Sequence, residues 1–225
     1  MTFSIVARCQ QTGQLGIAIS SSSIAVGARC PWVRAKVGAV ASQNITLPSL
    51  GAQILDLLES DSLAPPQALE QALAADEWHQ YRQVAVVDHQ GRTAVFTGDQ
   101  ALGVYNAVEG RQCVAAGNLL ADKTVIQAMT TCFEQASGSL GDRLLAAMQA
   151  ALDAGGEAGP VHSAALKIVG DVPWPIADLR VDWADELPLK ELCNLWEAYK
   201  PQMQDYLDRA LNPSLAPSYG VPGDE

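Results

Sequence analysis

Hydrophobic and polar positions alternate near the start of the chain. Residues 3–8 carry an apolar side chain at every second position, and a similar run, 15–20, follows the turn-forming sequence Gln11-Thr12-Gly13. A period of two around a short turn predicts a β-hairpin. Residues 36–43 (KVGAVASQ) are small and apolar on both faces, which predicts a third strand buried between two layers.

The period then changes to that of a helix. Leucine or isoleucine occupies positions 50, 54, 57 and 58, and Leu69 and Leu73 repeat the stripe after Pro65-Pro66, which predicts two consecutive helices. The remaining pattern predicts strands over 81–88, 92–97 and 112–117, helices over 125–133 and 140–152, and strands over 162–169 and 176–182.

The C-terminal region predicts one more helix, from Leu189 to Tyr206, which Pro201 should kink. Its stripe of large side chains predicts core packing or contact with a second copy, and we expect a homodimer; the stripe consists of Trp196, Tyr199, Met203 and Tyr206. Residues 212–225 are rich in proline and glycine, which predicts an irregular tail after a single domain over 1–211.

Strands and helix pairs occur in separate runs, without regular βαβ alternation. This order predicts an α+β fold, a four-layer αββα sandwich of two antiparallel sheets, each covered by a helix pair. The chain has 225 residues, of which 48% are hydrophobic and 17% charged, a composition typical of one globular core.

The net charge and the N-terminal sequence bear on which partners and which cellular location we expect. Lys and Arg number 14 against 25 Asp and Glu, and the resulting net charge of −11 would repel nucleic acid and anionic membranes. No apolar run is long enough for a spanning helix, and MTFSIVARC does not resemble a signal peptide, so we expect a cytoplasmic protein.

Familiar chemical motifs are missing from the sequence. It has no phosphate-binding loop, dinucleotide fingerprint, serine elbow or zincin helix, and we expect no cofactor. Its three histidines and five cysteines are widely spread without a C-x-x-C pair, so we expect no metal site and no disulfide framework.

Thr2 is the remaining candidate for covalent chemistry. Removal of Met1 would give one residue both a hydroxyl nucleophile and a free α-amino group, whose pKa of about 7.7–8.0 suits a base at neutral pH. The alternative is that Thr2 only begins a strand, since threonine favours strands.

The chain resembles, over nearly its whole length, a prokaryotic family of unknown function with an N-terminal-nucleophile (Ntn) hydrolase fold. The matching stretches are TFSIVAR at 2–8, TG-x-LG-x-A-I at 12–19, PW at 31–32, VGAVASQ at 37–43, YRQVAVVD at 81–88, FTG at 96–98, AAGN at 115–118, SAAL at 163–166 and DLRVD at 178–182. The resemblance implies the αββα sandwich, a first strand beginning at Thr2, and Thr2 as nucleophile.

One stretch departs from the family pattern. Relatives commonly carry two arginines in the glycine-rich stretch before SAAL, whereas this chain has GGEAGPVH at 155–162. An anion-binding role of those arginines is therefore in doubt here.

Several residues are candidates for the surroundings of Thr2. Strand alternation places Ser4 on the same side as Thr2, and Ser21, within the run 20–23, offers a hydroxyl unless it only forms a turn. Arg34 and Lys36 flank the third strand, where a cation would lower the pKa of the amine unless both belong to a solvated edge.

Amide side chains are candidates for holding an oxyanion. Asn118 ends one predicted strand, and Gln43 with Asn44 ends another, although each could instead cap a turn or helix.

Charged residues near the predicted cleft suggest a place for the substrate. Arg82 lies in an apolar run and needs a carboxylate, either from the substrate or from Asp182 or Glu157 in a structural ion pair. His162 follows a flexible glycine run that would bring it or Glu157 to the rim, although a lone histidine is usually structural.

The sequence therefore predicts an Ntn-type amidohydrolase or acylase that cleaves a small amide or peptide-like substrate through an acyl-enzyme on Thr2. The alternative is a non-catalytic binding or assembly protein that keeps the same sandwich.

Overall fold

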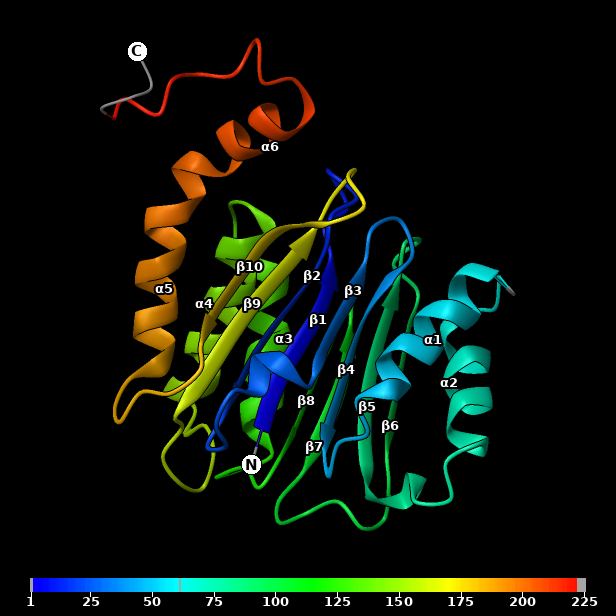
Figure 1. Cartoon of the computed structure of the whole chain (residues 1–225). Coiled ribbons are helices and arrows are strands. Elements are labelled where there is room, and N and C mark those ends of the chain that lie inside the picture. The colour runs from blue at the N-terminus through cyan, green and yellow to red at the C-terminus, as the bar shows by residue number, and fades with distance from the viewer. Residues whose placement is uncertain (1, 61, 222–225) are drawn as a thin grey trace.

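A computed structural model of the chain describes residues 2–60 and 62–221. Two antiparallel sheets lie face to face, and helices cover the outer face of each (Figure 1). The predicted α+β class and the four-layer αββα sandwich are confirmed.

The larger sheet has the strand order β10-β9-β2-β1-β8-β7. Its strands are β1 (Thr2–Arg8), β2 (Leu15–Ser21), β7 (Asn106–Gly110), β8 (Cys113–Asn118), β9 (Ser163–Val169) and β10 (Pro175–Val181). The first hairpin and the two closing strands match the prediction. Strand β7 was not predicted because its sequence, NAVEG, is short and half polar.

The smaller sheet has the order β3-β4-β5-β6. Its strands are β3 (Pro31–Arg34), β4 (Gly38–Asn44), β5 (Arg82–Asp88) and β6 (Thr93–Thr97). The four-residue β3 is too short to show a period, and the sequence pattern missed it. Lys36, predicted to begin the third strand, instead lies in the turn between β3 and β4 with a φ of 63°.

Helices α1 (Ser49–Ser60) and α2 (Pro65–Ala74) cover the smaller sheet. The larger sheet carries α3 (Thr124–Gln135) and α4 (Leu140–Asp153), and also α5 (Pro188–Tyr199), which packs against β9 and β10 (Figure 1). The larger sheet is therefore covered by three helices, one more than the predicted pair.

Pro201 interrupts the C-terminal helix as predicted. A 3₁₀ turn over Lys200–Gln202 separates α5 from α6 (Met203–Leu211), because proline lacks the N–H that a helix interior requires. Two further 3₁₀ turns are η1 (Val26–Ala28) and η2 (His79–Tyr81). Residues 212–221 contain neither helix nor strand, and 222–225 of the predicted tail lie outside the described residues.

The aromatic stripe packs mainly on its own chain. Trp196 is 2% exposed and donates to Asp142 at 2.8 Å, and Tyr199 donates to the carbonyl of Ile176 at 2.8 Å. Tyr206 stacks on Tyr199 but is 41% exposed. The homodimer stays a prediction.

Alternation along β1 sorts its side chains between two cores. Phe3, Ile5 and Ala7 pack under the helices of the larger sheet, while Val6 packs in the layer between the two sheets. Thr2 and Ser4 share the side of Val6, because successive strand residues point to opposite faces. Within the described residues, no helix is long and apolar enough to cross a membrane.

Candidate active site

Thr2 begins β1 in the interior of the larger sheet. It lies directly opposite Ser21 on β2 and Asn118 on β8, so all three side chains point into the layer between the sheets. Thr2 Oγ1 is 3.2 Å from Ser21 Oγ, and the residue is 5% exposed. The structure thus brings together three of the residues that the sequence proposed.

A chain of neutral hydrogen bonds continues from Ser4 across to the smaller sheet. Ser4 Oγ donates to Gln43 Oε1 at 2.7 Å, and Gln43 Nε2 donates to Gln83 Oε1 at 2.9 Å and to the Ala116 carbonyl at 3.1 Å. Both amide protons of Gln43 are therefore committed, which leaves none for a substrate oxygen.

Gln83 is the centre of this network, and sequence reasoning did not select it. Its Oε1 also accepts from Asn118 Nδ2 at 3.2 Å, and its Nε2 is 3.1 Å from both Thr97 Oγ1 and the Gly117 carbonyl. Gln83 is fully buried on β5, so it joins the two sheets. The available signal was a polar residue that directly precedes the apolar run 84–87 and lies in the same buried strand.

Asn118 carries an unsatisfied atom. It is fully buried, yet within the described part of the chain its Oδ1 has no hydrogen-bond partner, and only one proton of its Nδ2 is used, by Gln83. A buried polar atom without a partner costs about 1–3 kcal/mol. Asn118 can therefore both donate to and accept from a molecule that reaches Thr2.

Glu157 lies just beyond the start of β1. It forms an isolated bridge with Leu120, two residues after β8, and accepts from the N–H of Ser22, one residue after β2, at 3.3 Å. Gly155 and Gly156, with φ of 111° and 60°, turn the chain back after α4 and deliver Glu157 to this place.

Burial of the carboxyl group of Glu157 favours its neutral form. Glu157 is 6% exposed, and its Oε1 has no hydrogen-bond partner among the residues that the structure describes. Burial raises its pKa to about 8, although the positive charge of the N-terminus and the hydrogen bond from Ser22 act in the opposite direction. At pH 7 the group is therefore mostly protonated and can donate a hydrogen bond.

Hydroxyl groups brace the serine turn after β2. Ser21 Oγ is 2.9 Å from Ser23 Oγ, and Ser163 Oγ donates to the Ser23 carbonyl at 2.6 Å. Ser20 and Ser21 end β2, and only Ser22 and Ser23 lie in the bend that the sequence favoured for the whole run 20–23. Ser21, the neighbour of Thr2, is therefore a strand residue.

His162 lies next to the site through its backbone only. Its N–H donates to the Ser21 carbonyl at 2.8 Å. Its ring stacks on Trp183 at a centroid distance of 4.4 Å, and its Nδ1 donates to the Ala184 carbonyl at 2.9 Å. These contacts fix the ring against Trp183.

Arg34 and Lys36 lie outside the layer that contains Thr2. The Arg34 guanidinium is bound by Asp56 at 2.7 Å and Glu59 at 2.6 Å, both on α1. Lys36 is 69% exposed and lies 3.7 Å from Asp171. Both cations are engaged at the outer surface.

Arg82 has a different partner from those predicted. Its Nε donates to Asp76 at 2.8 Å in a buried pair, while Asp182 pairs with Arg180 at 2.8 Å. The expected pairing of Arg82 with Asp182 or Glu157 is therefore wrong. Asp76 lies only six residues before Arg82, and the chain reverses between them through η2. Asn44, at the end of β4, donates to the Tyr81 carbonyl at 2.6 Å.

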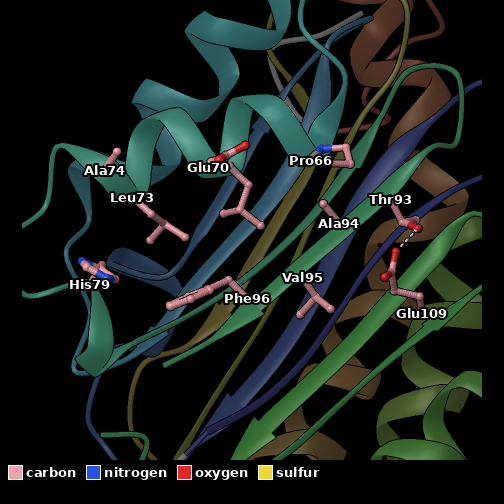
Figure 2. A pocket seen from close by; sticks show the side chains of 11 residues that line it. Pro66, Glu70, Leu73, Ala74, His79, Thr93, Ala94, Val95, Phe96 and Glu109 are labelled. Atoms are coloured by element: carbon pink, nitrogen blue, oxygen red, sulfur yellow. Dashed lines mark hydrogen bonds between the residues drawn. The ribbon is translucent and has the colours of Figure 1, made fainter. Parts of the chain in front are cut away.

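A separate cavity of about 520 Å³ lies between α2 and the edge strand β6. Its walls are largely apolar, with Leu73 and Phe96 facing each other, and Glu109 accepts a hydrogen bond from Thr93 at one end (Figure 2). No group of three or more His, Cys, Asp or Glu side chains suited to a metal occurs within the described residues.

The family model described as "Family of unknown function (DUF1028)" matches residues 2–192. The chain belongs to this family, which confirms the resemblance inferred from the sequence. A crystal structure of a protein with the same family model, from Silicibacter pomeroyi, is 31% identical and has a TM-score of 0.84, over 91% of this chain and 89% of that one.

Two more distant structures are Anbu proteins. Anbu (ancestral beta-subunit) from Yersinia bercovieri is 12% identical with a TM-score of 0.41, covering 96% of this chain and all of its own. A Gly-1 mutant of Anbu from Hyphomicrobium sp. strain MC1 is 12% identical with a TM-score of 0.44, covering 90% and 96% of the two chains. Both the sequence identities and the TM-scores of these two matches are low. No curated protein matches the chain.

Proposed function

We propose that the protein is an N-terminal-nucleophile hydrolase that cleaves a small amide through an acyl-enzyme on Thr2. The observation that supports it best is the place of Thr2. It starts an interior strand, with its hydroxyl 3.2 Å from Ser21 and the partly unsatisfied Asn118 directly opposite. Removal of Met1, which lies outside the described residues, would expose the amino group on the same residue.

The proposed reaction has two steps. Thr2 Oγ1 attacks the amide carbon while its proton passes to the α-amino group, and the C–N bond then breaks as this proton moves to the leaving amine. Water attacks the resulting ester, releases the acid and restores the threonine. No cofactor takes part.

Two neighbours have defined tasks in this proposal. The unused Nδ2 proton of Asn118 stabilises the oxyanion, and the neutral carboxyl of Glu157 hydrogen-bonds the polar end of the substrate. Arg34, Lys36 and Gln43 have no task, because their hydrogen-bonding groups are engaged elsewhere or exposed at the surface.

Intact-mass measurement after treatment with an alkyl β-lactone tests the proposal. We expect protein from a bacterial host to lack the mass of Met1 and to gain one acyl group on Thr2. Ser4→Ala is the matched control, since it removes a hydroxyl from the same face and should still be acylated. Retention of Met1 on all molecules, or acylation that persists in Thr2→Ala, would reject the mechanism.

The alternative function, non-catalytic binding, is favoured by the apolar cavity between α2 and β6 (Figure 2). A cavity of this size accommodates a small apolar ligand. Titration with alkylamines tests it: Leu73→Trp, which fills the cavity, should abolish binding, whereas the exposed Leu211→Trp should not.

A further inference from the structure

A polar cavity of about 370 Å³ lies at the opposite end of β1 from Thr2. Four segments meet there: the end of β1, the β1–β2 turn, the β7–β8 turn and the α3–α4 connection. Three arginines line the cavity, namely Arg8, Arg111 and Arg143, together with Gln112 and the Ser137-Gly138 backbone.

Arg8 and Arg143 are held in place by neutral acceptors. Arg8 donates to the His89 carbonyl and to Gln112 Oε1, both at 2.7 Å. Arg143 donates to the Phe133 carbonyl at 3.0 Å and lies 4.1 Å above the centroid of the Phe133 ring. These bonds orient the guanidinium groups without neutralising them, and each retains an unused Nη group.

Arg111 is the least engaged of the three arginines. It occupies the β7–β8 turn and is exposed, and its guanidinium has no hydrogen-bond partner among the described residues. Glu134 accepts from its backbone N–H at 2.6 Å, so this carboxylate fixes the turn and not the side chain.

The charge around the cavity is not balanced. Within residues 2–60 and 62–221, no carboxylate lies within ion-pair distance of these three guanidinium groups. Of the nearby acids, Asp142 is already paired with Lys200 at 2.8 Å, which leaves Glu134. Three positive charges thus gather at one hollow in a chain whose net charge is −11.

The buried Cys9 also lines the cavity, and its thiol is surrounded by hydrogen-bond partners. Burial acts to raise the pKa of its thiol, but hydrogen bonds with Thr12 and Gln11 and the charge of Arg143 lower it below its ordinary value.

We propose that this cavity binds a small phosphate-bearing anion. Guanidinium groups recognise phosphate through paired N–H donors, and two of the three are already fixed by the protein. A long polyanion such as nucleic acid would meet the acidic remainder of the surface, whereas a small anion can enter the hollow.

Titration with pyrophosphate, followed by amide NMR of the intact protein, tests the proposal. We expect the amide signals of Gln112, Ser137 and Gly138 to shift, and Arg111→Gln to weaken the affinity about tenfold or more. Arg180→Gln removes the same charge at another exposed position and should leave the affinity nearly unchanged. Raised salt should weaken binding.

Three results would overturn the proposal. They are the absence of shifts at these amides, equal losses in Arg111→Gln and Arg180→Gln, and citrate binding as tightly as pyrophosphate. The proposal does not depend on Thr2, since Thr2→Ala should bind pyrophosphate as the unmodified protein does. The two proposals can therefore fail separately.

Discussion

The two ends of β1 handle polar groups in opposite ways. At its first residue, Thr2 joins a buried layer of hydroxyls and amides, all uncharged, that bond mainly to one another. At its last residue, Arg8 belongs to a group of three cations without carboxylate partners in the described chain. About 20 Å of strand separates the two ends.

This difference indicates that the two ends of β1 suit different tasks. A buried neutral network holds its members in fixed positions, which suits the placement of a reacting group. At the other end, Arg8 and Arg143 are also held in place, but their charges are not neutralised, so the group is stabilised when a counter-ion enters the cavity.

Replacing Thr2 by alanine should have the largest effect. We expect amide hydrolysis, or β-lactone acylation, to fall at least about a thousandfold, because the nucleophile is lost. Thr2→Ser should retain part of the activity. Thermal unfolding monitors the fold, and unchanged turnover of Thr2→Ala would contradict the proposed role.

Glu157→Gln should change how stability depends on pH. The folded pKa of about 8 lies above the ordinary value of 4.5. The contribution of Glu157 to the free energy of unfolding is therefore fully present below pH 4.5 and is lost as the pH rises through 8. Above pH 8 the variant should be more stable by up to about 5 kcal/mol.

Urea unfolding at pH 5 and pH 9 measures the Glu157 effect. Glu134→Gln, an exposed carboxyl outside this site, is the control and should show no comparable change. If the free energies of unfolding of the unmodified protein and of Glu157→Gln change equally between pH 5 and pH 9, Glu157 is ionised in the folded protein and the prediction is wrong.

Gln83→Met should destabilise the sandwich by about 2–4 kcal/mol. The methionine fits the volume but leaves N–H groups of Gln43 and Asn118 without their acceptor inside the protein. Chemical denaturation measures the change, and Gln127→Met on the exposed face of α3 should have almost none. If Gln83→Met leaves the free energy of unfolding unchanged, the hydrogen-bond network is dispensable for stability.

Arg143→Met should cost about 1 kcal/mol. The variant loses the hydrogen bonds to the last turn of α3 and the cation above the Phe133 ring, but it keeps the apolar stem. The same denaturation assay measures it. A loss as large as that of Gln83→Met would contradict the contrast between the two ends.

Arg111→Gln should have the smallest effect on the ligand-free protein, within about 0.5 kcal/mol. Its guanidinium makes no bond to a described residue, and its removal relieves repulsion from Arg8 and Arg143. Comparison of melting temperatures at low and high salt measures this. A marked destabilisation would assign Arg111 a structural role instead of ligand binding.

Much of the architecture followed from local patterns. Period-two runs gave the first hairpin, and leucine stripes gave the helix pairs, because burial of one face imposes these periods. Strands β3 and β7 were not predicted, because their four and five residues are too few to show a period of two. The third helix over the larger sheet was predicted as a helix, but its place was not.

The candidate site, too, was predicted only in part from the sequence. Thr2, Ser4, Ser21 and Asn118 share a face because strand alternation and register are regular. The partner of Arg82 was misjudged, since Asp76 reaches it through a local reversal that hydrophobic patterns do not describe. Gln83 was overlooked because a buried amide differs from an exposed one only in what surrounds it.

Periodicity and local sequence matches were enough to predict the family, the order of the elements and which side chains share a strand face. Which distant residues meet became clear only from the folded chain. It joined Gln83 to Gln43 and Asn118, brought Glu157 beside the start of β1, and gathered three arginines at its other end. Such contacts depend on how strands and helices that are distant in the sequence pack together, which no local stretch of sequence encodes.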